Sequence, residues 1–164
     1  MAVIIELLKD QTISSLSFDC GIEALNRYLV TQAKQDMKRH LSATYLLRVD
    51  TKIIGYYTLS STSVSLHELK SDFVRKMPRY PLFPATLIGR LAIDNQYKGR
   101  GFGEKILLDA LKSSYMLSKK IGSIAVILDA KNKEAVNFYL HYGFIKLDKN
   151  KMFLPMKTIK KLFD

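Results

Sequence analysis

The sequence predicts a single domain of mixed α/β structure, in which helices flank a central mixed sheet. Apolar residues recur at spacings of three and four from Ile22 to Ala33 and from Ile106 to Tyr115, which is typical of amphipathic helices. Short runs rich in Val, Ile, Leu and Tyr, bounded by turn residues, alternate with these helices as strands do. A chain of 164 residues can bury one substantial core, so we expect one domain over residues 1–164.

Each element follows from a local pattern, and proline and glycine mark the breaks between elements. Residues 65–85 hold three of the four prolines, so this segment is expected to be a loop with at most one or two helical turns. The other expected elements, in chain order, are an edge strand at Val3–Lys9, a helix from Gly21 to about His40, strands at Ala43–Val49 and Ile53–Val64 joined by a turn at Asp50–Lys52, a strand at Thr86–Asp94, a helix from Gly101 to about Lys120, a buried strand at Ile121–Ala130, a helix from Asn132 to Tyr142 ended by Gly143, strands at Phe144–Leu147 and Lys151–Leu154, and a last helical turn from Thr158.

Composition limits the possible functions. The net charge of +11 favours polyanionic partners such as nucleic acid, although it also fits a merely solvated surface. The apolar runs are too short to span a bilayer, and Glu6, Lys9 and Asp10 interrupt the stretch where a signal peptide needs an unbroken apolar core. We therefore expect a cytoplasmic protein with no membrane partner. Cys20 is expected to be a small buried hydrophobe, and the three scattered histidines predict no metal site.

A glycine-rich turn falls between an expected strand and an expected helix. Gly99, Gly101 and Gly103 let the chain turn tightly and let a ligand approach the main chain, while the helix start offers unpaired N–H groups to an anion. Lys98 and Arg100 are expected to add positive charge at the rim. The turn lacks the Gly-Lys-Ser/Thr ending of a Walker A loop, and GRGFGE brings the third glycine one position too early for a dinucleotide fingerprint. Alone, the turn predicts either an anion site or a structural turn.

Two motifs at a fixed separation narrow this interpretation. QYKGRG, residues 96–101, fits Q/R-x-x-G-x-G/A just after the strand LAID, and NFYLHYGF, residues 137–144, lies roughly forty residues further on. Together they resemble the acetyl-CoA motif and the F-Y-x-x-x-G-F element of the GNAT superfamily of N-acetyltransferases. FDCGIEALNRYL, IIGYYTLSSTSV, FPATLIGRLAID and LPMKTIKKLF also resemble the GNAT toxins of type II toxin–antitoxin systems, the TacT-like group, over nearly the whole chain.

The resemblance implies a GNAT fold, whose central sheet is mixed and mostly antiparallel, and in which two parallel strands, Thr86–Asp94 and Gly122–Ala130, splay apart around acetyl-CoA as co-substrate. It implies an enzyme that acetylates the α-amino group of aminoacyl-tRNA and so blocks translation, a small ribbon-helix-helix antitoxin as partner, and a homodimer. Asn132 is implied as a cofactor contact and is equally expected to be a helix N-cap. The implied cofactor-binding residues are Leu91, Ala92, Ile93, Lys98, Gly99, Arg100, Gly101, Phe102, Gly103, Glu104, Asn132 and Phe138.

Tyr139 is the catalytic candidate. A phenol, with a pKa of about 10, can donate a hydrogen bond or proton to the thiolate that leaves the thioester, and the matching family position carries that general-acid role. The alternative is a core aromatic, the role expected of Tyr142. No carboxylate stands out as a general base, which fits an α-amine with a pKa of about 8 better than a lysine with a pKa of about 10.4.

Basic residues are the candidates for contact with the substrate. Arg75, Lys76, Arg79 and Arg90 are expected to flank the acceptor cleft, and phosphate contacts by such residues give salt-sensitive affinity for RNA. Other functions stay open: a GNAT enzyme that acetylates a small-molecule amine or a protein N-terminus, or a non-catalytic GNAT-fold binding module. The residues that would extend the basic track are Lys34, Lys38, Arg39, Lys157, Lys160 and Lys161.

Overall fold

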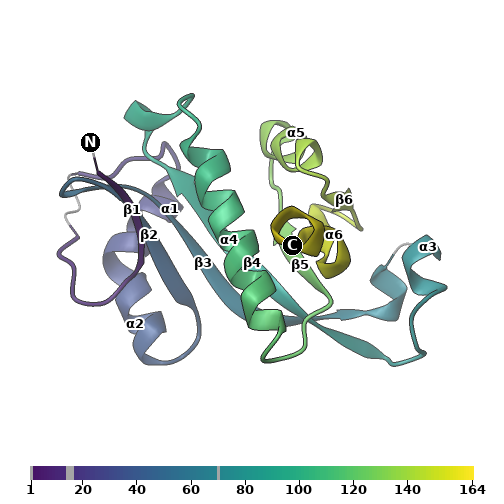
Figure 1. Ribbon diagram of the computed structural model, residues 1–164. Coiled ribbons are helices and arrows are strands. Elements are labelled where there is room, and N and C mark those ends of the chain that lie inside the picture. The colour runs from purple at the N-terminus through teal and green to yellow at the C-terminus, as the bar shows by residue number, and fades with distance from the viewer. Residues whose placement is uncertain (1, 14–16, 70) are drawn as a thin grey trace. The chain divides into compact units, whose positions relative to one another are not determined.

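One seven-stranded sheet organises the chain (Figure 1). The computed structural model describes residues 2–13, 17–69 and 71–164. The strands lie in the order β1-β2-β3-β4-β5-β7-β6. The β4–β5 pair is parallel, whereas β1–β2, β2–β3, β5–β7 and β6–β7 are antiparallel. This mostly antiparallel sheet with one parallel pair, flanked by helices, confirms the fold class predicted from the sequence.

The elements have the following bounds. The strands are β1 (Val3–Leu7), β2 (Ala43–Val49), β3 (Lys52–Ser65), β4 (Leu82–Ile93), β5 (Ala125–Asp129), β6 (Ile145–Lys146) and β7 (Lys151–Pro155). The helices are α1 (Glu23–Arg27), the π-helix η1 (Tyr28–Gln32), α2 (Ala33–Lys38), the 3-10 helix η2 (Leu66–Glu68), α3 (Ser71–Val74), the 3-10 helix η3 (Asn95–Tyr97), α4 (Phe102–Ser118), α5 (Lys133–His141) and α6 (Met156–Phe163).

The chain forms two compact units. The first comprises residues 1–60 and 88–110, and the second comprises residues 61–87 and 111–164. Strands β3 and β4 and helix α4 each contribute residues to both units. The single domain expected over residues 1–164 stays a prediction.

In the first unit, the pleat of β3 directs neighbouring side chains to opposite faces of the sheet. Tyr56 donates from its hydroxyl to the carbonyl of Leu25, 2.7 Å away, on the face covered by α1, η1 and α2. Tyr57 donates to a carboxylate oxygen of Asp109 on α4, at 2.6 Å. Helices therefore cover both faces of the sheet here. The apolar core on the α1 side consists of Leu8, Phe18, Cys20, Tyr28, Leu29, Ala33, Leu46, Ile53, Tyr56 and Ala92.

In the second unit, β5 pairs with strands on both sides. The parallel ladder within this unit joins Thr86 to Val126 and Leu87 to Ile127, and the antiparallel ladder to β7 runs from Ala125 to Asp129. Strand β5 is buried apart from its last residue, as its continuous apolar sequence predicts. The unit's core consists of Val64, Leu69, Phe83, Ala85, Ala125, Ile127, Leu147 and Phe153.

The sequence located every strand and the helices α4, α5 and α6, but it did not predict the 3-10 helix η3. Several boundaries also differ from the prediction. Strand β4 begins at Leu82, so residues 82–85 are not loop; Pro84 lacks an N–H, but its carbonyl accepts a hydrogen bond from the amide of Ile124 at 2.9 Å. Strand β5 is only Ala125–Asp129, strand β6 only Ile145–Lys146, and α6 begins at Met156, directly after Pro155.

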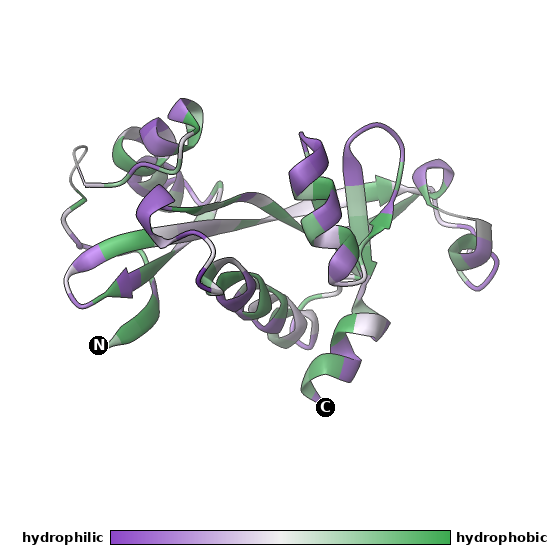
Figure 2. Cartoon of the chain, turned by 90° about the horizontal axis from the view of Figure 1, so that it is seen from above, coloured by the Kyte–Doolittle hydropathy of each residue, from purple (hydrophilic) through white to green (hydrophobic). Residues whose placement is uncertain are grey.

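Helix periodicity was predicted correctly, but its detail was not. The expected helix to His40 ends at Lys38 and contains the π-helical turn η1, which a count of apolar spacings does not reveal. Helix α4 carries hydrophobic and hydrophilic stripes along its length (Figure 2), as expected of a helix with one buried face. Among the described residues, no helix is both long and apolar enough to cross a membrane.

Candidate active site

The glycine-rich turn is supported from below by a buried carboxylate in the first unit. Asp94, only 3% exposed, follows β4 and accepts from the amide of Gln96 at 2.9 Å, which caps η3. Its second oxygen accepts from the amide of Asp19 at 3.1 Å. The carbonyl of Asp19 in turn accepts from the amide of Asn95 at 2.8 Å. The two bonds to Asp19 fix the end of β4, and so the start of the turn, against that residue.

Two glycines set the shape of the turn. Gly99 has a φ of 77° and Gly101 a φ of 86°. These values are unfavourable for L-residues that carry a Cβ atom. A Cβ at either position would meet no protein atom within 4 Å. Within the protein, glycine is therefore required at these positions by the backbone conformation and not by crowding from neighbouring atoms. The open space beside both glycines leaves room for a ligand.

Helix α4 begins immediately after this turn. The first amide that bonds within the helix is that of Lys105, which donates to the carbonyl of Gly101 at 3.1 Å. The preceding amides, of Phe102, Gly103 and Glu104, belong to the helical turn that has no intrahelical acceptors. With the positive end of the 17-residue helix dipole, they offer main-chain donors to an anion, and the anion site at this turn stays a prediction.

The side chains of Lys98 and Arg100 make protein contacts in addition to the charge expected of them at the rim. The ammonium of Lys98 donates to the carbonyl of Cys20 at 2.8 Å, so this lysine ties the turn to the loop before α1. The guanidinium of Arg100 lies over the ring of Tyr97, 5.2 Å from its centroid, and stays on the exposed surface. Burial raises the pKa of the Cys20 thiol, which is 2% exposed, and this confirms its expected role as a small buried residue.

The end of β4 is tightly packed. Ala92 and Ile93 are buried and Leu91 is half-buried. A Cβ at Gly55 on β3 would come within 2.8 Å of the Ile93 side chain and 3.0 Å of the Ala92 carbonyl, so glycine is required there for the two strands to approach.

Tyr139 lies in an aromatic environment in the second unit. Its ring contacts Phe138 edge to face at 5.2 Å between centroids and Phe144 at 5.4 Å. Tyr139 is 8% exposed, and burial raises the pKa of its hydroxyl to about 12. The phenol is therefore a hydrogen-bond donor throughout the physiological range. Both roles weighed for this residue, core aromatic and proton donor, are compatible with this position.

Helix α5, which carries Tyr139, begins and ends as predicted. The side-chain oxygen of Asn132 accepts from the amide of Ala135 at 2.8 Å, so Asn132 is the N-cap. Gly143, with a φ of 94°, follows the last turn. Phe138 is half-buried and contacts both Tyr139 and Tyr142 edge to face.

The four candidate substrate residues have different surroundings. Arg75 is paired with Asp72 at 2.8 Å, and both side chains are highly exposed. Arg79 is also exposed. Lys76 lines a cavity in the second unit. Arg90, in the first unit, is half-buried and lies against the face of Tyr28, 3.4 Å from the ring centroid.

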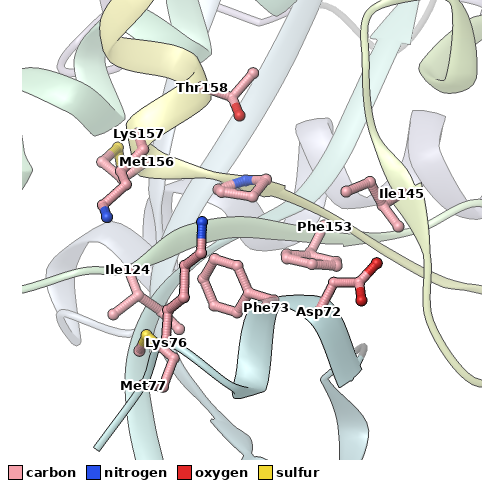
Figure 3. A pocket seen from close by; sticks show the side chains of 11 residues that line it. Asp72, Phe73, Lys76, Met77, Ile124, Ile145, Phe153, Met156, Lys157 and Thr158 are labelled. Atoms are coloured by element: carbon pink, nitrogen blue, oxygen red, sulfur yellow. The ribbon is translucent and has the colours of Figure 1, made fainter.

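That cavity has a volume of about 660 Å³ and is mainly apolar. Figure 3 shows Lys76 and Lys157 on one side and Asp72 with Ile145 on the other. Phe73 and Phe153 contact each other edge to face within its wall, at 5.5 Å. Its lining residues are Asp72, Phe73, Lys76, Met77, Ile124, Ile145, Phe153, Pro155, Met156, Lys157 and Thr158. Among the described residues, no group of three or more His, Cys, Asp or Glu side chains could hold a metal ion.

A family profile described as "Acetyltransferase (GNAT) domain" matches residues 40–146, which include the glycine-rich turn and Tyr139. The chain belongs to the GNAT acetyltransferase family. Membership in this family identifies it as an N-acetyltransferase and confirms the resemblance drawn from QYKGRG and NFYLHYGF.

Two curated GNAT relatives resemble the chain closely. The "Probable toxin TacT" of Sinorhizobium fredii (strain NBRC 101917 / NGR234) is 31% identical, over 97% of this chain and 94% of that protein. The "tRNA-acetylating toxin" of Mycobacterium tuberculosis (strain ATCC 25618 / H37Rv) is 33% identical, over 78% of this chain and 76% of that protein.

Solved GNAT structures match over the whole chain. A tyrosine-to-phenylalanine mutant of KacT superposes with a TM-score of 0.92 at 33% identity, covering 99% of this chain and 100% of that one. AtaT complexed with acetyl-methionyl-tRNAfMet has a TM-score of 0.91 at 31% identity, with the same coverage. A tyrosine-to-phenylalanine mutant of AtaT, bound to the C-terminus of the antitoxin AtaR and acetyl-CoA, has a TM-score of 0.83 at 30% identity and covers 99% of both chains.

Sequence reasoning missed several polar residues around the candidate GNAT site. Asp94 and Asp19 support the glycine-rich turn, and the pKa of Asp19 is lowered by hydrogen bonds from the amide of Gly21 and then from the side chain of Asn26. The buried carboxylate at the end of the strand LAID was the available signal, because a buried Asp needs partners. The contact between Arg90 and Tyr28 had no signal in the sequence, since 62 positions separate the two residues.

Proposed function

We propose that this protein is an acetyl-CoA-dependent toxin that acetylates the α-amino group of aminoacyl-tRNA and thereby blocks translation. The observation that carries the proposal is the match, over 99% of the chain, to AtaT complexed with acetyl-methionyl-tRNAfMet. The names of the two curated relatives, a probable toxin and a tRNA-acetylating toxin, support the same reaction. The net charge of +11 suits a polyanionic substrate.

The first unit supplies the proposed cofactor site. The free amides at the start of α4 and the open space beside Gly99 and Gly101 fit the pyrophosphate of acetyl-CoA. The main chain of Leu91–Ile93 is proposed to bond the pantetheine arm. A solved relative, the AtaT mutant, is bound to acetyl-CoA. Of the sequence-derived set, Lys98 would act by holding the turn in place, and Asn132 by starting α5, in addition to any contact with the cofactor.

Tyr139 is proposed to stabilise the leaving group. The neutral amine attacks the thioester carbonyl, a C–N bond forms, the C–S bond breaks, and the sulfur leaves with the electron pair as a thiolate. A free thiol has a pKa of about 8.5, so a phenol with a pKa of about 12 gives up its proton to a thiolate unfavourably. Tyr139 therefore acts as a hydrogen-bond donor to sulfur, and the proton that sulfur finally carries comes from the attacking nitrogen. Solved forms of KacT and AtaT carry a tyrosine-to-phenylalanine substitution, which supports a functional tyrosine in relatives.

Partners follow from the same proposal. AtaT is bound to the C-terminus of the antitoxin AtaR, and we propose an antitoxin of the ribbon-helix-helix class for this chain. A homodimer and a cytoplasmic location, where charged tRNA is used, complete the proposal.

One experiment tests the reaction. The purified protein is incubated with acetyl-labelled acetyl-CoA and, in separate reactions, charged tRNA, uncharged tRNA, spermidine and a peptide with a free N-terminus. Label transferred to charged tRNA alone supports the proposal. Label on spermidine or peptide alone supports an ordinary amine acetyltransferase, and label on none of the four contradicts enzymatic activity on these substrate classes.

The role of Tyr139 needs its own variant. Tyr139→Phe should lower kcat by about 100-fold or more, the usual effect of removing one hydrogen-bond donor to the charge that develops in the transition state. Tyr142→Phe, at the end of the same helix, removes a neighbouring hydroxyl and should retain activity. Equal activity of Tyr139→Phe and the wild type would contradict the donor role without affecting the proposed substrate.

A further inference from the structure

The helical segment before β2 contains one π-helical turn, at Tyr28–Gln32. The amide of Ala33 donates to the carbonyl of Tyr28, five residues earlier. Such turns are rare and often occur at functional sites, because they rotate the side chains that follow relative to those before. Tyr28 is the first residue of this turn, and Asp36 lies one turn beyond its end. The hydroxyl of Tyr28 donates to a carboxylate oxygen of Asp36 at 2.7 Å.

Asp36 is held as an anion. Its other oxygen accepts from the side-chain amide of Gln32 at 3.2 Å. The hydrogen bond from Tyr28, then that from Gln32, lower the pKa of Asp36, and the positive charges of Arg90 and Arg39 act in the same direction. Burial, followed by the hydrogen bond to Asp36, raises the pKa of Tyr28. At neutral pH the pair is therefore a carboxylate bonded to a neutral phenol. The negative charge of Asp36, hydrogen-bonded to the ring's hydroxyl, makes the face of the Tyr28 ring more attractive to a cation.

Arg90 occupies that face. Its guanidinium carbon lies 3.4 Å from the centroid of the Tyr28 ring. Within the described part of the chain, Arg90 forms no salt bridge, so its charge is held by a ring face and by a carboxylate that contacts the ring's hydroxyl. A direct Arg–Asp pair would occupy the N–H donors at the guanidinium edge, whereas stacking leaves the five donors available to a ligand.

The donors that remain match a phosphate. Planar guanidinium groups bind phosphate oxygens in bidentate fashion, and stacking on an aromatic ring reduces the freedom lost on binding. Arg90 shares one face of β4 with Ala92, because side chains alternate along a strand. Ala92 packs with Tyr28, Leu29 and Tyr56 beneath the helical segment 23–38. This position is separate in sequence from the amides of residues 102–104, which are proposed to hold the pyrophosphate of acetyl-CoA.

We propose that Tyr28 and Asp36 are positioning residues that hold the guanidinium of Arg90 for a phosphate of the tRNA acceptor strand. The inference rests on the proposed function for the identity of the phosphate, since acetyl-CoA carries phosphates as well. On this proposal, Arg90 binds a phosphate of the tRNA, and the free amides at the start of α4 bind the phosphates of acetyl-CoA.

A double-mutant cycle tests the coupling. The variants are Tyr28→Leu, Arg90→Gln and the two combined, and the measurements are the Kd for uncharged tRNA, the KM values for charged tRNA and acetyl-CoA, and kcat. Each single change should weaken tRNA binding about 10-fold, and the double variant should be no weaker than Arg90→Gln alone, since both remove one interaction. Arg90→Gln should also reduce the slope of log Kd against log salt by about 0.7 to 0.9, one phosphate contact. The KM for acetyl-CoA should change less than about twofold in all three, well inside the tenfold effect above.

Milder variants separate positioning from folding. Tyr28→Phe keeps the ring but loses the hydrogen bond to Asp36, and Asp36→Asn replaces the carboxylate by a neutral acceptor. Both variants should weaken tRNA binding about twofold to threefold, the range of one modest hydrogen bond. Tyr45→Leu is the matched control, because Tyr45 also stacks on a ring, that of Tyr57 at 4.8 Å, without an arginine. It should bind tRNA as the wild type does.

The outcomes are distinct. Additive losses in the double variant would show that Tyr28 does not act through Arg90 and would overturn the inference. A raised KM for acetyl-CoA with unchanged tRNA binding would assign the phosphate to the cofactor and would also overturn it. If the wild type binds tRNA with the expected coupling but fails to acetylate charged tRNA, the inference stands and the proposed reaction is wrong.

Discussion

The buried phenol of Tyr139 makes a quantitative prediction about stability at high pH. Burial raises its pKa from an ordinary value of about 10 to about 12. Above about pH 10 the unfolded chain loses this proton while the folded chain retains it, so the folded state binds more protons and stability falls as pH rises. The stability is fully present below about pH 10 and is lost progressively toward about pH 12, up to about 2.7 kcal/mol for two pKa units.

The loss can be isolated by comparing the wild type with Tyr139→Phe. At about pH 11 the expected difference is about 1.3 kcal/mol relative to about pH 9, because the unfolded phenol is then about nine-tenths ionised and the folded one about one-tenth. Urea denaturation at the two pH values gives the four free energies of unfolding. Subtracting the variant removes the contributions of the other tyrosines, including Tyr56, whose pKa burial also raises.

Tyr80→Phe is the control, since the Tyr80 ring is 60% exposed and folding does not bury it. If wild type and Tyr139→Phe lose the same stability between the two pH values, the phenol is not desolvated. Burial would then not keep Tyr139 protonated, and its role as a hydrogen-bond donor that retains its proton during the reaction would be wrong.

Three further predictions concern the site's scaffold. Gly101→Ala should cost about 1 kcal/mol of stability because of its φ of 86°, and should raise the Kd for acetyl-CoA, whereas Gly122→Ala should do neither; urea denaturation and calorimetric titration measure both. Asn132→Ala should cost about 1 kcal/mol through the lost N-cap, and Asn132→Asp should restore most of it; a full loss in both variants would refute the capping role. Lys98→Met should speed hydrogen exchange of the amides of residues 98–101, because it removes the bond between the turn and the carbonyl of Cys20. Lys105→Met, at an exposed lysine, is the control; equal exchange rates in the two variants would show that the Lys98 bond does not hold the turn.

The fold could be predicted because its elements have strong local signals. The alternation in Ala43–Val49 and the capping signals around Asn132 and Gly143 located β2 and α5 to the residue or nearly so. The errors occur where tertiary hydrogen bonds override local preference. Pro84 was interpreted as loop, yet its carbonyl bonds to Ile124, which no local rule anticipates. Likewise, the side chain of Tyr28 at the π-helical turn bonds to Asp36 and contacts Arg90, partners that no local rule anticipates.

The candidate site shows the same division. Gly99 and Gly101 were recognisable because a positive φ selects for glycine, and the structure has both in that conformation. The tether formed by Lys98 was not recognisable: its charge suggested an anion contact, which stays a prediction, and the structure shows its ammonium bonded to a carbonyl 78 residues away in sequence. The sequence shows that a lysine carries a positive charge, but the group that its ammonium bonds depends on which loop packs beside it.

The two halves of the proposed reaction fit one electrostatic pattern. An α-amine with a pKa of about 8 is about one-tenth neutral at pH 7, whereas a lysine amine with a pKa of about 10.4 is neutral in fewer than one molecule in a thousand. A net charge of +11 disfavours an additional ammonium near the protein, which lowers the amine's pKa further while attracting the phosphates that carry it. A buried, protonated phenol at Tyr139 then needs only to stabilise the departing sulfur. In the proposed reaction the basic surface would contribute to nucleophile activation as well as to binding, and an acceptor without phosphates, such as a polyamine, would be repelled by the same charge.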